Sequence, residues 1–283
     1  MSDAPTICAN IDQCRELITR ARTNARVGLV PTMGALHEGH LSLVRASKQH
    51  CDFTAVTIFV NPTQFGANED LDAYPRPLEQ DINTLKELGV DLVFTPDEST
   101  MYPPGCSTVV QPPDVASVLE GAHRPTHFSG VTTIVCKLFQ ILPAHIAFFG
   151  RKDYQQTVVI RRMVQDLNIP IEIQVEPTVR ESDGLALSSR NQYLNEEQRQ
   201  RAVALSESLS LAIDRFRAGE TDAEQVRNAM MQHLQSNNVK SIDYVALVDP
   251  DTLQPLSEVR AGAVALVAAK VGGTRLIDNK QID

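Results

Sequence analysis

Short apolar runs and longer segments with helical spacing alternate along the first 180 residues. The apolar and β-branched runs predict buried strands, and they lie at residues 27–30, 52–60, 91–96 and 145–149. The alternating pattern at residues 171–175 predicts a further, half-exposed strand. The segments between them place apolar residues three and four positions apart, which predicts helices at residues 13–22, 41–48, 77–89, 131–142 and 154–167. This order is typical of a parallel sheet with helices on both faces.

The alternation ends near residue 180, where the pattern of elements changes. Two helices are expected one after the other at residues 196–217 and 222–235, and strands of a small antiparallel sheet at 241–248 and 263–271. We therefore expect two domains, residues 1–180 and residues 181–283, with α/β and α+β architecture respectively.

The junction between the first predicted strand and the next helix carries two histidines, His37 and His40, three residues apart. If the helix begins near Glu38, both imidazoles lie on one face, at a helix N-terminus that stabilises phosphate. Gly39 has no Cβ, so a nucleotide can approach the backbone there. Two alternatives remain at this stage, namely solvated loop histidines and a metal site, although the zinc-protease helix places its histidines four residues apart.

Two further segments follow predicted strands in the same way, residues 61–64 and residues 150–153. In an open parallel sheet, ligands bind outside the carboxyl ends of the strands. We therefore expect these two segments and the histidine loop to converge on one ligand.

Composition narrows the class of ligand. The apolar and charged fractions, 42% and 22%, are ordinary for a globular protein, and the net charge of −9 argues against general nucleic-acid binding. The five cysteines include no Cys-x-x-Cys pair, which fits reduced thiols better than disulfides or a zinc site. No apolar stretch reaches membrane-spanning length and the N-terminus lacks a signal-peptide pattern, so we expect a cytoplasmic enzyme that acts on small molecules.

Five segments together resemble one family. They are Pro31-Thr32-Met33-Gly34-Ala35-Leu36-His37-Glu38-Gly39-His40 and the segments at residues 59–65, 127–131, 149–156 and 183–191. In this order they resemble the pantothenate synthetase family, of the His-x-Gly-His nucleotidyltransferase superfamily. The resemblance implies a Rossmann-like parallel sheet with helices on both faces, plus a smaller α+β C-terminal lid domain. It also implies a homodimer and Mg²⁺ accompanying ATP.

The implied reaction is ATP-dependent condensation of (R)-pantoate with β-alanine to pantothenate, through a pantoyl adenylate, with release of AMP and pyrophosphate. A carboxylate is a poor acyl donor, and a mixed anhydride with AMP supplies the missing leaving group. The alternative within the superfamily is an adenylyltransferase acting on a phosphorylated acceptor. A non-catalytic nucleotide-binding regulator is the third possibility.

The resemblance also implies roles for individual residues. His37, in the proton-donor role, and His40 would stabilise charge at the α-phosphate, with Lys152, Ser188, Ser189 and Arg190 completing the catalytic set. The expected ATP-binding residues are Pro31, Thr32, Met33, Gly34, Ala35, Leu36, His37, Glu38, Gly39, His40, Gly150, Arg151, Lys152, Asp153, Val179, Leu187, Ser188, Ser189 and Arg190. The backbone of residues 33–39 is expected to cradle the phosphates. If the resemblance is set aside, other interpretations remain. Lys152 then lies in an exposed basic turn, Asp153 caps a helix, and residues 188–190 form a Ser-rich linker.

Substrate contacts are implied in the same way. Gln64 is expected to bind pantoate and β-alanine, and Gln156 to bind pantoate, because a neutral amide both donates and accepts hydrogen bonds. Tyr74, Arg124 and His127 are further candidates for substrate contact. Asp81 is a candidate Mg²⁺ ligand, although one carboxylate in a predicted helix is also a common solvent-facing residue.

Overall fold

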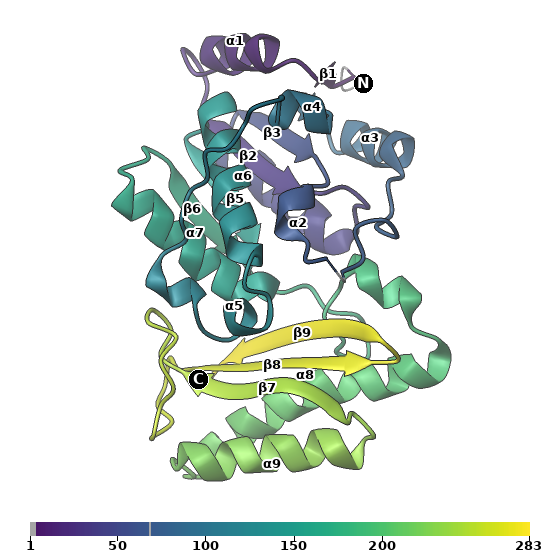
Figure 1. Ribbon diagram of the computed structural model, residues 1–283, viewed down its shortest axis with the longest axis vertical. Helices are drawn as coiled ribbons and strands as arrows, with labels where there is room; N and C mark the ends of the chain where they lie inside the picture. Colours follow the sequence, from purple (N-terminus) through teal and green to yellow (C-terminus); the bar gives the residue numbers. More distant parts are fainter. Residues whose placement is uncertain (1–3, 68) are drawn as a thin grey trace. The chain divides into compact units, whose positions relative to one another are not determined.

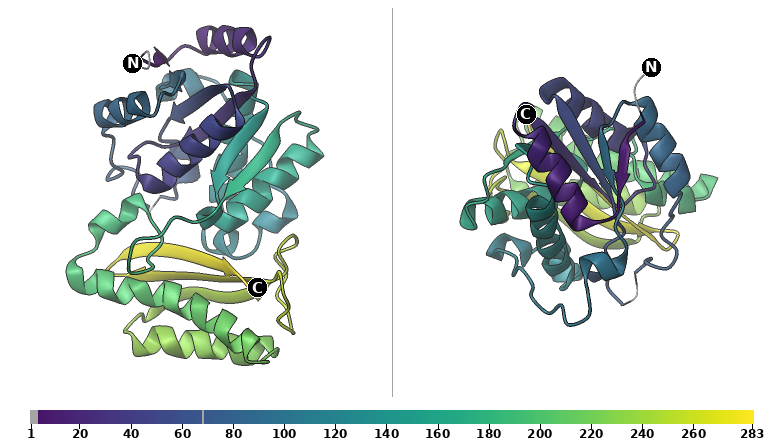
Figure 2. Two further views of the ribbon diagram at one scale, coloured as in Figure 1. Left: turned by 180° about the vertical axis from the view of Figure 1, so that it is seen from behind. Right: turned by 90° about the horizontal axis from the view of Figure 1, so that it is seen from above.

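The computed structural model describes residues 4–67 and 69–283, which form two compact units (Figures 1 and 2). The first unit contains the residues up to Gly150 together with Gln156–Pro177. The second contains Arg151–Gln155 and Thr178–Asp283. The short segment Arg151–Gln155 therefore groups with the C-terminal part of the chain, although the sequence pattern places it in the first domain.

A six-stranded parallel sheet forms the centre of the first unit, as the alternating pattern predicts. Its strands stand in the order β1-β4-β3-β2-β5-β6. Their bounds are β1 Thr6–Cys8, β2 Val27–Thr32, β3 Phe53–Ile58, β4 Leu92–Phe94, β5 Ile146–Gly150 and β6 Glu172–Glu176. The longer helices are α1 Ile11–Ala21, α2 Glu38–His50, α3 Leu78–Glu87, α6 His127–Ile141 and α7 Tyr154–Asp166. Short turns of helix lie at η1 Pro62–Gln64, α4 Glu98–Met101, η2 Asp114–Ala116 and α5 Glu120–His123.

Successive strand residues point to opposite faces of this sheet, and each face has its own core. Leu29 and Ala147 belong to the core that includes residues of α1, α6 and α7. Their neighbours Val30 and Phe148 belong to the core formed with α2 and α3. Helices therefore cover both faces, and burial on both sides explains why the strands read as continuous apolar runs.

The strand order reverses between β2 and β5, which pair with each other. From β2 the chain proceeds through β3 to β4 on one side, and β5 and β6 extend the sheet on the other. The loop after β2 leads to His37, and Gly150 ends β5. The histidine motif thus lies at the switch point, where ligands of open parallel sheets bind.

The second unit has a three-stranded antiparallel sheet, β7 Ser241–Val248, β8 Val264–Val271 and β9 Thr274–Gln281. Helices α8 Glu196–Arg217 and α9 Ala223–Ser236 share one apolar core with these strands. The remaining turns of helix are η3 Arg151–Asp153 and η4 Ser189–Tyr193. Among the described residues, no helix combines the length and apolarity needed to span a bilayer.

Two strands and one helix start differ from the sequence prediction. The short edge strand β1 and the polar strand β9 were not expected. The helix expected at residues 131–142 begins earlier, because α6 already starts at His127. The N-terminal turn of α6 packs against η1 through Gly130, and this tertiary contact extends the helix beyond its apolar periodicity.

Candidate active site

His37 and His40 cap the N-terminus of α2 and hold each other in place. His37 is the N-cap residue, and its Nδ1 accepts a hydrogen bond from the Gly39 N–H at 3.1 Å. The Nδ1 of His40 accepts from the His37 N–H at 3.3 Å, which completes a reciprocal capping box. The two rings lie 4.1 Å apart between centroids. The predicted helix start and the shared face of the two histidines are therefore present.

These bonds indicate which tautomer each ring adopts when it is neutral. A nitrogen that accepts a hydrogen bond carries no proton, so a neutral imidazole in this position is the Nε2–H tautomer. Each ring thus presents Nε2–H as its donor, while Nδ1 serves the helix cap. Because the rings are only 4.1 Å apart, charging both would cost like-charge repulsion.

Asp81 in α3 braces the loop that precedes the histidines. Its carboxylate accepts hydrogen bonds from the N–H groups of Ala35 and Leu36 at 2.8 and 2.9 Å. Gly34 and Ala35 both have positive φ, +82° and +51°, a conformation that is strained for alanine. Asp81 is 3% exposed, and burial raises its pKa although the two N–H bonds oppose the shift. Asp81 therefore holds a strained loop in place.

The N–H groups of the expected backbone cradle and the carboxylate of the candidate metal ligand Asp81 already have hydrogen-bond partners within the chain. The N–H groups of residues 34–37, 39 and 40 already donate within the chain, to the partners Thr32 Oγ1, Asp81, His40 Nδ1, His37 Nδ1 and the His37 carbonyl. Because an N–H has one proton to donate, these groups would have to exchange their present partners in order to bind a phosphate. Both oxygens of Asp81 are likewise engaged, and residues 4–67 and 69–283 contain no cluster of three or more metal-binding side chains.

Gln64 stands in the η1 turn after β3 and touches the histidine loop. Its Nε2 donates to Met33 Sδ at 3.0 Å, and its Oε1 accepts from Asn61 Nδ2 at 3.1 Å. Asn61 is 1% exposed and also accepts from the Tyr102 hydroxyl at 2.7 Å. The sequence indicates the turn at Asn61–Gln64 but not that Asn61 holds the Gln64 side chain. The signal available for this role is an asparagine between a predicted strand and a proline.

The side chains of Arg124 and His127 contact the backbone carbonyl of Gln64. Arg124 forms a bidentate pair with Glu69, with both N···O distances 2.6 Å. Burial raises the pKa of Glu69, but the Arg124 hydrogen bonds and charge outweigh it and lower that pKa. His127 bonds the Gln64 carbonyl through Nδ1 at 2.9 Å, and burial together with the charge of Arg124 lowers its pKa to about 4. These contacts support the Gln64 turn and leave the guanidinium fork of Arg124 engaged by Glu69.

Tyr74 and Gln156 are the remaining predicted substrate residues of the first unit. Tyr74 is buried and packs edge-on against Phe65, with ring centroids 5.9 Å apart. Gln156 lies partly buried in the first turns of α7. A cavity of about 430 Å³ opens beside Met33 and Gly34, at the carboxyl ends of β3 and β4. The edge of the sheet next to the histidine loop is therefore hollowed enough for a small molecule.

Apart from Gly150, which ends β5 in the first unit, the other predicted ATP-binding residues belong to the second unit. Lys152 is part of η3, and its Nζ lies 3.7 Å from Asp153 Oδ1. Ser188 caps η4 by accepting from the Arg190 N–H at 3.3 Å. Val179 and Leu187 are joined by a backbone hydrogen bond of 3.0 Å, so the loop that ends at Ser188 closes on itself.

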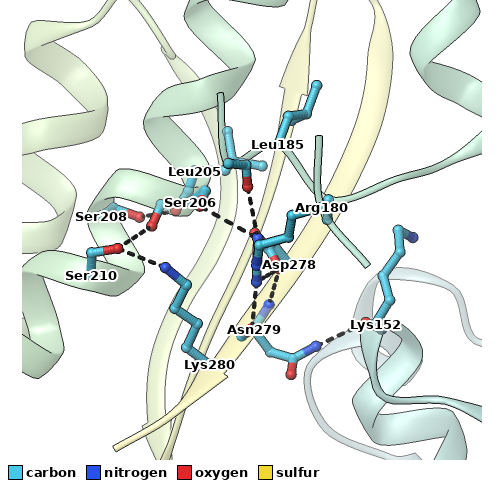
Figure 3. Close-up of polar contacts among 12 residues, drawn as sticks. Lys152, Arg180, Leu185, Leu205, Ser206, Ser208, Ser210, Asp278, Asn279 and Lys280 are labelled. Atoms are coloured by element: carbon cyan, nitrogen blue, oxygen red, sulfur yellow. Dashed lines mark hydrogen bonds and ion pairs between the residues drawn. The ribbon is translucent and has the colours of Figure 1, made fainter. Parts of the chain in front are cut away.

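Polar side chains anchor this loop firmly within the second unit. Arg180 forms a bidentate pair with Asp278 of β9, at 2.7 and 2.9 Å (Figure 3). On the other side, Glu181 pairs with Arg199 of α8 at 3.0 and 2.7 Å and accepts from Asn191 at 3.2 Å. The segment that carries Ser188, Ser189 and Arg190 is thus an ordered loop rather than a flexible Ser-rich linker.

Comparison with known proteins identifies relatives along nearly the whole chain. A family model of pantoate-beta-alanine ligase matches residues 6–281. A pantothenate synthetase from Rhodopirellula baltica is 55% identical over 272 residues, which cover 95% of this chain and 94% of that protein. The structure of pantothenate synthetase from Thermus thermophilus matches with a TM-score of 0.93 at 44% identity, covering 98% of this chain and 99% of that one. A pantoate-beta-alanine ligase from Francisella tularensis, solved in complex with beta-gamma ATP and beta-alanine, matches with a TM-score of 0.81 at 37% identity over 98% of each chain.

Proposed function

Because this chain belongs to the pantoate–β-alanine ligase family, we propose that it makes pantothenate from pantoate, β-alanine and ATP through a pantoyl adenylate. The observation that carries the proposal is the family match over residues 6–281. The same match disfavours the adenylyltransferase alternative, in which a phosphorylated compound accepts the AMP.

In the first step a pantoate carboxylate oxygen bonds to the α-phosphorus of ATP, and the bond to the bridging oxygen breaks so that pyrophosphate leaves. Negative charge builds on the α-phosphate oxygens as this happens. The Nε2–H groups of His37 and His40 are the donors that this charge requires, and the helix cap holds them in a fixed direction. Such preorganised donors stabilise the transition state without reorganising during the reaction.

Lys152, Ser188, Ser189 and Arg190 are proposed to bind the remaining phosphates. An ammonium acts as a point charge on phosphate oxygens, and a guanidinium fork suits the leaving pyrophosphate. The predicted roles of Gly150, Arg151, Asp153, Val179 and Leu187 at the nucleotide remain part of the proposal. Mg²⁺ supplies charge neutralisation to ATP, and it is commonly held by phosphate oxygens, water and one or two carboxylates rather than by a protein cage.

Gln64 and Gln156 are proposed to hold pantoate. The Gln64 amide donates to the Met33 thioether, which is a weak acceptor. A substrate oxygen can therefore replace this partner at little cost. In the second step the amine of β-alanine bonds to the acyl carbon, loses a proton, and AMP leaves with the electrons of the C–O bond. We also propose a cytoplasmic homodimer, on the family's usual organisation.

The decisive assay is ATP–pyrophosphate exchange without any amine. Exchange that requires pantoate, followed by pantothenate and AMP formation when β-alanine is added, supports the proposal. Exchange that requires a phosphorylated acceptor instead of pantoate would refute it.

A substitution at His37 can separate the roles of its two ring nitrogens, the helix cap and the phosphate donor. His37→Asn keeps an acceptor at the position of Nδ1 and so keeps the cap, but it removes the Nε2–H donor. We expect wild-type thermal stability and an exchange rate about 10²–10³-fold lower, as for loss of one oxyanion donor. His50→Ala, at the exposed end of the same helix, is the control and should retain the wild-type rate. A wild-type rate in His37→Asn would remove His37 from the chemistry.

A further inference from the structure

Strand β9 carries two neighbouring polar residues that are almost fully buried, Asp278 at 4% and Asn279 at 3% exposure. Successive strand residues point to opposite faces of a sheet, so this pair reaches in two directions. Asp278 and Lys280 engage residues on one side, Arg180 and Ser210, whereas Asn279 turns to the η3 turn (Figure 3). All of these contacts lie within the second unit.

The Asn279 side chain holds the backbone on both sides of Lys152. Its Nδ2 donates to the carbonyl of Arg151 at 2.9 Å and to the carbonyl of Lys152 at 2.9 Å. These carbonyls belong to the two peptide groups that flank the Lys152 α-carbon, so both are fixed by one amide. A reversed amide would place Oδ1 against two carbonyl oxygens, and therefore only the donating orientation fits.

The Asp278 side chain holds the start of the other phosphate-binding segment. Its bidentate partner Arg180 also donates to the Gly184 carbonyl at 3.0 Å and to the Asn279 carbonyl at 3.2 Å. The Asn279 N–H in turn donates to Asp278 Oδ1 at 2.7 Å. Two adjacent residues of one strand thus fasten the η3 turn and the loop that leads to Ser188.

We propose that Asn279 is a positioning residue for Lys152, and that Asp278 beside it supports residues 188–190 through Arg180. This inference rests on the proposed function, in which both segments bind the phosphates of one ATP. A lysine side chain has much conformational freedom, so its charge is useful only if its backbone is fixed. Joining both segments to one strand keeps their spacing constant within the second unit, which lowers the entropy cost of orienting them.

Asn279→Ala removes both hydrogen bonds to the turn. We expect the kcat of pantoate-dependent ATP–pyrophosphate exchange to fall about tenfold or more, since small misplacements of catalytic groups are costly. The KM for pantoate should stay within about twofold, because pantoate is bound by residues of the first unit. Asn279→Ser keeps one donor and should be intermediate. Asn237→Ala is the matched control, because Asn237 also donates to a backbone carbonyl, that of His233, at an exposed helix end.

The proposal requires that the effect of Asn279→Ala on exchange depends on the Lys152 side chain. In a Lys152→Ala background, Asn279→Ala should lower exchange by no more than about twofold, because coupled residues are not additive. An equal loss of rate in both backgrounds would overturn the proposal, as would a wild-type rate in Asn279→Ala.

Hydrogen–deuterium exchange tests the support of the turn without relying on activity. The amides of Arg151–Gln155 should exchange faster in Asn279→Ala than in the wild type or in Asn237→Ala. Should the alanine variant not fold, the same comparison is made with Asn279→Ser. Unchanged protection in these variants would overturn the positioning role. A wild-type enzyme without pantoate-dependent ATP–pyrophosphate exchange would instead refute the proposed function.

Discussion

Gly130, in the first turn of α6, is the point where that helix meets the Gln64 turn. A Cβ at this position would lie 2.4 Å from the Thr63 carbonyl oxygen and 2.6 Å from the Gln64 α-carbon. Both are backbone atoms, so no side-chain rotation relieves the clash. Gly130→Ala therefore tests whether the exact position of the Gln64 turn governs pantoate binding.

The size of the perturbation follows from these distances. Cβ contacts below 3.0 Å are essentially absent from real structures, so the contact at 2.4 Å must lengthen by 3.0 minus 2.4, at least 0.6 Å. Alanine is the better helix former by about 1 kcal/mol, which offsets part of the strain. Overpacking of this kind costs about 1–3 kcal/mol, so the net loss of stability is about 0–2 kcal/mol. A displacement of Gln64 on the order of 1 Å can lower the rate by up to about 10²-fold.

The assay is pantoate-dependent ATP–pyrophosphate exchange, with the KM for pantoate and ATP measured separately. We expect Gly130→Ala to raise the KM for pantoate and lower the rate, with the KM for ATP little changed. Gly66→Ala is the control, because its Cβ would meet only Glu69 side-chain atoms at 3.5 Å and beyond, an ordinary contact. Wild-type pantoate kinetics in a folded Gly130→Ala variant would show that Gln64 does not require its turn to be fixed.

Two further predictions concern the supports of the site. The pKa of His127 is lowered from 6.5 in the unfolded chain to about 4 in the folded protein. Its contribution to the free energy of unfolding, roughly 3 kcal/mol, is therefore complete above pH 6.5 and is lost as the pH falls toward 4. Denaturant titrations at pH 7 and 4.5 should show a smaller acid loss in His127→Gln, and an equal loss would contradict this. Asp81→Asn should lower the free energy of unfolding by about 1–3 kcal/mol, because one backbone N–H loses its acceptor. It should leave the Mg²⁺ dependence of exchange unchanged, and a higher Mg²⁺ requirement at wild-type stability would identify a metal ligand instead.

The parallel sheet was predictable because strands buried on both faces read as continuous apolar runs. Strand β9 was not predictable in this way, because its residues Thr274–Gln281 are mostly polar and their hydrophobic pattern indicates no strand. A local signal was present all the same. Gly272 and Gly273 both have positive φ, +58° and +86°, in the two-residue turn that joins Val271 to Thr274. Two glycines directly after a predicted strand are a hairpin signal, and reading them would have placed Asp278 and Asn279 on a strand.

The location of the histidine motif was predictable, but its hydrogen bonding was not. Periodicity places His37 at a helix start, yet it does not say which donors of the loop are already used. Asp81 is 45 residues away from Leu36 in the sequence, and their hydrogen bond depends on how α3 packs against the sheet. Similarly, Arg124 pairs with Glu69 across 55 residues. Sequence spacing carries no information about such pairs, so these supporting contacts could not be predicted from the sequence.

The bonding of the loop also explains why histidine suits these two positions. Serine or aspartate at the N-cap would satisfy the Gly39 N–H but would offer no donor at the reach of Nε2. Lysine or arginine would donate to phosphate but has no acceptor with which to cap a helix. Imidazole carries one nitrogen for each task on a rigid ring, so the bond that caps the helix also fixes the tautomer and aims Nε2–H. Most backbone donors of the loop are engaged internally, and the two rings are the groups through which we propose that α2 meets a phosphate. Loss of either Nε2–H should therefore impair adenylation even where the fold is intact.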